Sequence, residues 1–359
     1  MNFLANACLF LLFSAAFALT ASQFLPKLTP RQLAVNQLVN ASRILALQGI
    51  ADDSLGHISV RDPLSPNTAF LITAGSSVPA HVTPADIAVV RINDSVVTSA
   101  ALSAYPPPKP NPGIFIHSSI YQRFPNTTVS SIAYYAPEQL LPFALFPDNS
   151  PNVTSTSVTP EDLTGFYAVT SGAAFLGAYP APVYSVFDAE SGATSVTVDN
   201  AIKGYEMAQK FGPAGASSQT VNLKDGFRPL VLMRNDGATM VGATVPETVF
   251  RFVQAVKNAR VLYHFLSSTD AIVPQFLPAG VATEATDNPT VRSWLLWMSQ
   301  IEASIKADSA RSPELWEGDS VSNSSSVNKN HGAHQQPFAA SASILAVCVA
   351  IFNVMLYRL

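Results

Sequence analysis

The sequence predicts a three-layer domain of the α/β or α+β class. Helical and strand-like segments are mixed along the chain without strict βαβ alternation, which is typical of such layered domains. Between two strongly apolar ends lie about 290 residues, enough for one large domain with a sizeable core. No internal repeat interrupts this region, so we expect one domain over residues 31–307.

The first half of this region predicts one helix and then several strands. Residues 31–49 carry apolar side chains at helical spacing, and Gly49 is a typical helix end. Short apolar runs follow, separated by turn signals such as Asp62-Pro63. We expect strands at 57–60, 69–73, 87–92 and 130–135, and further helices at 114–124 and 137–146.

The second half predicts a loop-rich stretch, a hairpin and two long helices. Residues 148–182 are rich in Ser, Thr, Pro and Gly, and a helix fits 199–211. Asn235-Asp236-Gly237 is a strong turn signal between the apolar runs 229–234 and 238–242. The expected helix 246–265 starts with Pro246 and Glu247. A last helix fits 290–306, where Trp294 and Trp297 are expected to cover core or an oligomer contact.

Both ends of the chain resemble targeting segments. An apolar run and then small residues predict a secretory signal peptide over residues 1–22; an N-terminal membrane anchor is the alternative. After a polar stalk, 308–337, comes an apolar tail at 338–359. The small-residue cluster around Ser324, the polar spacer and the tail predict a GPI-attachment signal, with a single transmembrane helix as the alternative. We therefore expect a lipid-anchored protein on the outer leaflet of the plasma membrane or in the cell wall.

Cysteine and charge content narrow the function classes. The two cysteines, Cys8 and Cys348, both fall in the targeting segments, so the mature domain is expected to form no disulfide. The net charge of −4 and the lack of a basic cluster argue against nucleic acid as a partner. Five sequons are expected to be usable in the secretory pathway: Asn40, Asn93, Asn126, Asn152 and Asn323.

Five blocks of residues carry a more specific signal, because together they resemble the class II aldolase/adducin family. The resemblance covers about residues 31–268 and implies a three-layer α/β/α domain with a central mixed, mainly antiparallel sheet. The first block runs from Ala41-Ser42-Arg43 to Leu55-Gly56-His57-Ile58-Ser59-Val60-Arg61, and the other four are Phe70-Leu71-Ile72-Thr73-Ala74-Gly75-Ser76, Ile116-His117-Ser118-Ser119-Ile120-Tyr121, Val231-Leu232-Met233-Arg234-Asn235-Asp236-Gly237 and Lys257-Asn258-Ala259-Arg260-Val261.

The resemblance also implies a chemistry that this chain does not carry. Enzymes of the family hold zinc or manganese with three histidines and move protons with a glutamate. The glutamate position is Gly113 here, the His-x-His strand reads 132–136 without histidine, and the third histidine is Asp236. With Ala133 and Tyr135 as the strand counterparts, no catalytic residue and no metal or other cofactor is expected. Asp236 is expected to serve its turn rather than a metal.

A smaller set of polar residues remains as a candidate ligand pocket: His57, Thr73, Ser76, Ser77 and His117. Residues 73–77 resemble the anion-binding loop of phosphate-using family members, whereas a buried and hydrogen-bonded role is expected for His117. Two hypotheses follow. The first is a non-catalytic surface or binding protein, with adducin as the family precedent. The second is an exported aldolase or decarboxylase-type lyase with a rebuilt site, which would need zinc or manganese. A homo-oligomer fits either, and the ligand is not specified by the sequence.

Overall fold

The structure of the protein, a computed structural model, describes residues 28–51, 56–75, 77–109, 111–146, 165–177, 180–189, 194–212, 227–268 and 289–311. The described residues up to Ala307 belong to one compact unit. The predicted signal peptide, Ser324 and the tail 338–359 lie outside the described residues. Within the described part, no helix is long and apolar enough to cross a membrane.

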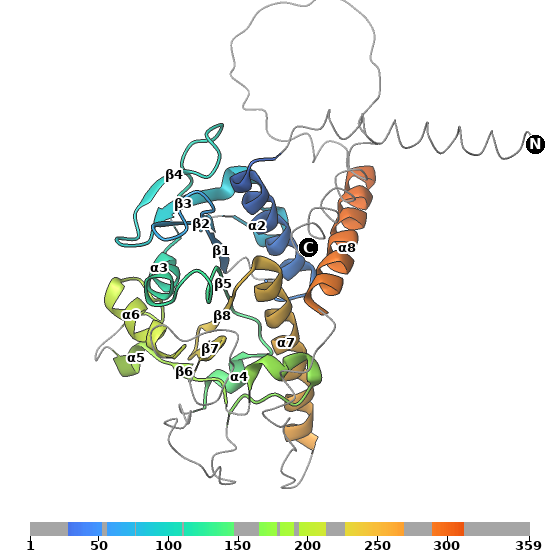
Figure 1. Cartoon of the computed structure of the whole chain (residues 1–359). Coiled ribbons are helices and arrows are strands. Elements are labelled where there is room, and N and C mark those ends of the chain that lie inside the picture. The colour runs from blue at the N-terminus through green and yellow to red at the C-terminus, as the bar shows by residue number, and fades with distance from the viewer. Residues whose placement is uncertain are drawn as a thin grey trace, which may run out of the picture. The chain divides into compact units, whose positions relative to one another are not determined.

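A single sheet organises the domain (Figure 1). Its eight described strands follow the order β4-β3-β2-β1-β5-β8-β7-β6. All neighbouring strands are antiparallel except β6 and β7, which confirms the predicted mixed, mainly antiparallel sheet. The strands are β1 His57–Arg61, β2 Ala69–Thr73, β3 Ile87–Arg91, β4 Val97–Ala100, β5 Ser131–Tyr135, β6 Val183–Tyr184, β7 Leu230–Met233 and β8 Gly237–Gly242.

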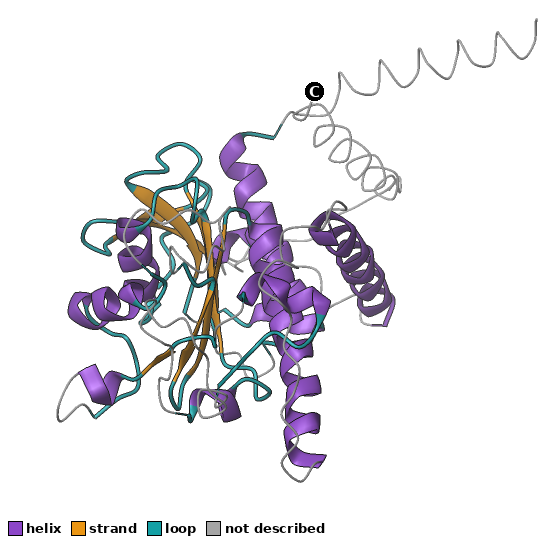
Figure 2. Ribbon diagram, turned by 60° about the horizontal axis from the view of Figure 1, so that its bottom comes forward, coloured by secondary structure: helices purple, strands orange, loops and turns teal. Residues whose placement is uncertain are grey.

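Helices cover both faces of the sheet, as the edge-on view in Figure 2 shows. One hydrophobic core joins the sheet to α2 (Pro30–Leu47), α7 (Val245–Ser268) and α8 (Pro289–Arg311). The second core joins the other face to α3 (Ile114–Arg123) and α6 (Ala201–Gln209). The short helices are α4 Leu141–Ala144 and α5 Val186–Ala189, and the 3-10 turns are η1 Pro79–His81, η2 Pro84–Asp86 and η4 Ser171–Leu176. The domain therefore has the three layers that the sequence predicts.

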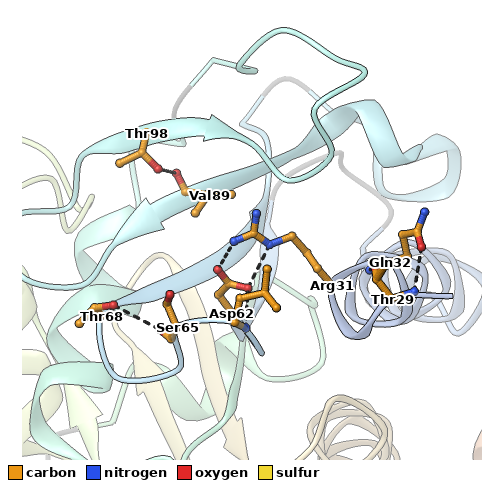
Figure 3. Close-up of polar contacts among 9 residues, drawn as sticks. Thr29, Arg31, Gln32, Asp62, Ser65, Thr68, Val89 and Thr98 are labelled. Carbon is orange, nitrogen blue, oxygen red and sulfur yellow. Dashed lines mark hydrogen bonds and ion pairs between the residues drawn. The ribbon is translucent and has the colours of Figure 1, made fainter.

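The start of α2 is fixed by local chemistry and by one ion pair. The Thr29 side chain accepts from the Gln32 backbone N–H while the Gln32 side chain accepts from the Thr29 N–H, a reciprocal capping box. Arg31 then reaches the carboxylate of Asp62, which follows β1, through its Nε at 3.1 Å and through a second nitrogen (Figure 3). This bidentate pair holds the first helix against the end of the first strand.

Several elements differ from the prediction for physical reasons. The expected helix 137–146 shrinks to α4, because Pro142 is tolerated only in a first helical turn. Strands β4 and β6 were not predicted: β4 is partly polar and β6 has two residues, too few for a periodicity. Helix α8 continues to Arg311, so the first residues of the predicted polar stalk are helical. Trp297 is buried in the core and Trp294 packs against it, as one of the two expectations had it.

Candidate functional site

A cluster of polar aromatic side chains lies between the sheet and α3. His57 begins β1, and its backbone is in register with Tyr134 of β5. The two rings stack with centroids 4.9 Å apart. The His117 ring of α3 also lies close to His57, tilted against it at a centroid distance of 4.7 Å. The structure thus brings together His57 and His117, both predicted as candidate pocket residues.

These side chains are joined by a continuous series of hydrogen bonds. His57 Nδ1 lies 2.5 Å from His117 Nε2, and His117 Nδ1 lies 2.6 Å from the Ser59 hydroxyl. That hydroxyl lies 2.8 Å from the Tyr121 hydroxyl, which donates to the Ser130 carbonyl at 3.3 Å. We call this series, His57–His117–Ser59–Tyr121–Ser130, the imidazole chain. Its members are buried except for the half-buried Ser130, so each hydrogen bond replaces water that the interior excludes.

Burial keeps both imidazoles uncharged. It lowers the pKa of His57 to about 3. The pKa of His117 is held well below its ordinary value by burial and, to a smaller extent, by the neighbouring His57. For Tyr121 burial is also the main influence, and it raises the pKa of the phenol. At neutral pH the imidazole chain therefore contains two neutral imidazoles and two neutral hydroxyls.

Asp236 does not contact the imidazole chain directly; it binds Tyr134. The Tyr134 hydroxyl, on β5, donates at 2.6 Å to Oδ1 of Asp236, which lies in the β7–β8 turn. Both side chains are half-buried, and burial raises the pKa of each. For Asp236 the hydrogen bond from Tyr134 opposes the effect of burial. The Asp236 carboxylate therefore holds a tyrosine, in addition to the turn role expected from the sequence.

Gly113, at the glutamate position of the family pattern, lies against His57. A Cβ added to Gly113 would stand 2.5 Å from His57 Nε2 and 3.0 Å from its Cε1. The space next to the glycine is therefore taken by the imidazole. The backbone there is tied by Asn111, whose side-chain oxygen accepts from the Gly113 N–H at 2.9 Å.

The strand register of the sequence analysis needs correction. Ala133 and Tyr135 point into the core on the α2 and α7 side, where the Tyr135 ring meets Phe252 at 5.9 Å. Side chains alternate along a strand, so Tyr134 and Ala136 are directed to the opposite face from these two. Both are half-buried, and the turn residue Gly237 backs onto the Cα of Ala136. The positions beside Asp236 are therefore 134 and 136.

The predicted anion-binding loop makes local contacts instead of joining the cluster. Thr73 is buried, and its hydroxyl accepts from the Ile58 backbone N–H at 3.1 Å. The Ser77 hydroxyl donates to the Ala74 carbonyl at 2.7 Å, and Ser76 lies outside the described residues. Thr73 thus has a structural role between β1 and β2, and no described contact brings Thr73 or Ser77 to His57.

Side chains present at the site do not fit the family's metal. Beside the turn lie Tyr134 and Ala136, neither of which offers an imidazole, and Asp236 supplies one carboxylate that already accepts from Tyr134. Across the residues that the structure describes, no three histidine, cysteine, aspartate or glutamate side chains come together as a metal site would require. We therefore derive no step through a metal ion.

Sequence reasoning missed Ser59 and Tyr121, two members of the imidazole chain. The signals were present. Ser59 is two residues after His57, so both side chains leave one face of β1. Tyr121 is four residues after His117, so both lie on one side of α3. What the spacing did not indicate is that these two faces meet.

A mainly antiparallel sheet between two helical layers is the arrangement that the resemblance to class II aldolases implies. The chain belongs to the family described as Class II Aldolase and Adducin N-terminal domain, whose model matches residues 36–263. The resemblance stated from the residue blocks is thereby confirmed.

Individual relatives agree with this assignment. The decarboxylase tropJ of Talaromyces stipitatus is 26% identical over 289 residues, covering 76% of this chain and 96% of its own length. An aldolase II superfamily protein from Pseudomonas syringae has a similar structure, with a TM-score of 0.52, 17% identity and coverage of 77% of this chain and 96% of its own. YgbL of Escherichia coli has a TM-score of 0.50 at 13% identity, covering 72% of this chain and all of its own. At sequence identities this low, the two structures are evidence for the fold alone.

Proposed function

We propose that this protein is a secreted, GPI-anchored member of the class II aldolase/adducin family that binds a partner or ligand at the cell surface and does not catalyse aldol chemistry. One observation carries the proposal: the side chains around the family's site bond to one another. Tyr134 donates its hydroxyl proton to Asp236, and His57 occupies the space beside Gly113.

The charge state of the cluster supports a non-catalytic role. General acid–base catalysis needs a group whose pKa lies near the working pH. Burial lowers the pKa of both imidazoles far from neutrality and raises that of Tyr134. Gly113 offers no carboxylate in place of the glutamate. The cluster is therefore suited to hydrogen bonding rather than to proton transfer at neutral pH.

Delivery to the surface is supported by sequence features and by two exposed sequons. Asn93 and Asn126 are exposed, so glycans on them would extend into solvent, whereas Asn40 is half-buried within α2. Asn152 and Asn323 lie outside the described residues. The apolar run at 1–22 would direct the protein into the secretory pathway, and the segment after Ser324 would be exchanged for a lipid anchor on the outer leaflet. From there the protein could be transferred to the cell wall.

Two measurements test the proposal. Phosphatidylinositol-specific phospholipase should release the native protein from membranes, and mass spectrometry should find no peptide from 338–359 in the mature form. The released protein should show no cleavage or decarboxylation of sugar-phosphate and β-keto acid substrates when zinc or manganese is supplied. An intact C-terminal tail would overturn the anchoring, and metal-dependent turnover would overturn the non-catalytic role.

A second candidate is an exported aldolase or decarboxylase-type lyase with a rebuilt site. The observation in its favour is the match over nearly the full length of the decarboxylase tropJ. This candidate requires zinc or manganese at a donor set other than the three histidines. Stoichiometric metal in protein purified without chelator, together with turnover that is lost on chelation, would favour it over the first.

A further inference from the structure

The direction of the imidazole chain can be worked out from its last member. The Tyr121 hydroxyl donates its one proton to the Ser130 carbonyl, which can only accept. Tyr121 must therefore accept from Ser59. Because the Ser59 proton is used in that bond, the Ser59 oxygen accepts from Nδ1 of His117.

This direction of donation determines the tautomers of both histidines. A neutral imidazole has one N–H, so His117, which donates from Nδ1, must accept at Nε2. His57 then donates from Nδ1 to His117. The remaining nitrogen, His57 Nε2, carries a lone pair. His57, the histidine nearest Tyr134, is thus held as a hydrogen-bond acceptor by a series of hydrogen bonds that ends four members away, at the Ser130 carbonyl.

His57 Nε2 has no hydrogen-bond partner among the described residues, and it is not one of the fully buried atoms that lack a partner there, so this nitrogen keeps some contact with solvent. The nitrogen faces the bare Cα of Gly113. An acceptor that solvent can reach is satisfied by water or by a ligand that supplies a proton. It therefore points to a donor that comes from outside the chain.

A second acceptor lies at the far end of Tyr134. This ring stacks on His57, and its hydroxyl uses its proton on Oδ1 of Asp236. The other carboxylate oxygen has no partner in the part of the chain described here. The Arg61 guanidinium is not a partner of this oxygen, because it donates to four backbone carbonyls, those of Pro66, Tyr121, Phe124 and Val129. The site thus presents acceptors on both sides of Tyr134.

We propose that His57 Nε2 and Asp236 form an acceptor site for an uncharged ligand that bears several hydroxyl groups. An anionic ligand would meet a lone pair and a carboxylate, both of which repel it. A polyol offers a donor to each acceptor. This inference names the ligand class for the non-catalytic surface protein proposed above and rests on that function.

Nitrogen NMR of the native protein labelled in its histidine rings tests the tautomers first. His57 should show a protonated Nδ1 and an unprotonated Nε2 at neutral pH. A protonated Nε2 would mean that the hydrogen bonds of the imidazole chain are donated in the opposite direction, and this would overturn the proposal.

Titration with ribitol, and with ribonate as its carboxylate counterpart, then tests the ligand class. Ribitol should shift the Nε2 resonance of His57, and ribonate should leave it unchanged. Gly113→Ala, which places a methyl group against Nε2, should abolish the ribitol shift. Asp236→Asn should weaken ribitol binding by roughly tenfold, since it replaces a charged acceptor. Asp94→Asn, at an exposed aspartate paired with Arg91, is the matched control and should bind as the parent does.

The outcomes separate the two proposals. Correct tautomers without any ribitol shift would overturn the ligand class and leave the non-catalytic role intact. A shift with ribonate that equals or exceeds that with ribitol would overturn the ligand class as well. Turnover of a supplied substrate would instead overturn the proposed function. If Gly113→Ala does not fold, the comparison of Asp236→Asn with Asp94→Asn decides the question.

Discussion

His57 Nε2 lies 2.5 Å from the point where a Cβ on Gly113 would stand. Imidazole and glycine are therefore complementary, and a side chain at position 113 competes with His57 for one space. The helix α3 begins at the next residue, so the glycine cannot move away without shifting the helix. This contact determines what can be restored at the site by mutation.

Gly113→Glu should consequently fail as a repair of the family's acid–base group. Overpacking of a filled site costs roughly 1–3 kcal/mol, and we expect a loss of this size in the free energy of unfolding. Adding His57→Ala to Gly113→Glu should recover part of the loss by opening the space. Urea denaturation of the single and double variants measures this; equal stability of Gly113→Glu and the parent would contradict the contact.

A metal site can be tested by its strand register. Histidines placed at 134, 136 and 236 should bind zinc, because Tyr134 and Ala136 lie beside the turn that carries Asp236. Histidines at 133, 135 and 236 should bind much more weakly, because the first two point into the opposite core. Competition with a zinc indicator compares the two variants after circular dichroism has shown that both fold. Tighter binding by the second set would refute the register.

Acid should destabilise the domain through His57. Its pKa falls from an ordinary value near 6.5 to about 3 on folding. Between these values the unfolded chain binds a proton that the folded chain does not, so stability decreases as the pH falls. The slope is at most about 1.4 kcal/mol per pH unit for this one group. His117, whose pKa is also lowered, adds to it in the same direction.

Thermal melting from pH 7 to pH 4 measures this dependence. His57→Phe removes one titrating group and should flatten the profile relative to the parent. It should also lower the melting temperature at pH 7, because His117 Nε2 loses its donor. A profile as steep as that of the parent would show that another group is responsible.

Arg61 should be among the most sensitive structural positions. Its guanidinium donates to the carbonyls of Pro66, Tyr121, Phe124 and Val129, and it lies 4.6 Å over the Tyr121 ring. Arg61→Lys keeps the charge and loses the fork of donors, so we expect a loss of roughly 3 kcal/mol or more in stability. Arg91→Lys, at an exposed pair with Asp94, should change stability by less than about 1 kcal/mol. Denaturant titration of both variants checks the contrast.

The sequence by itself determined the layers and most of the elements, because these depend on local periodicity and turn chemistry. The helix α7 and the β7–β8 turn are examples: the first follows from apolar spacing, the second from Asn235-Asp236-Gly237. The resemblance across five blocks of residues identified the family. The sequence alone also showed that no histidine occurs at residues 132–136 or at residue 236.

Only the tertiary structure decided which side chains meet. Tyr134 rather than Tyr135 faces Asp236, since the direction of a strand side chain depends on register, and one residue reverses it. The imidazole chain joins β1 to α3 and to the start of β5, which follow about 60 to 70 residues later in the sequence, so no local pattern could predict it. The lowered pKa of His57 has the same origin, because burial is a property of the packed domain and not of the residue.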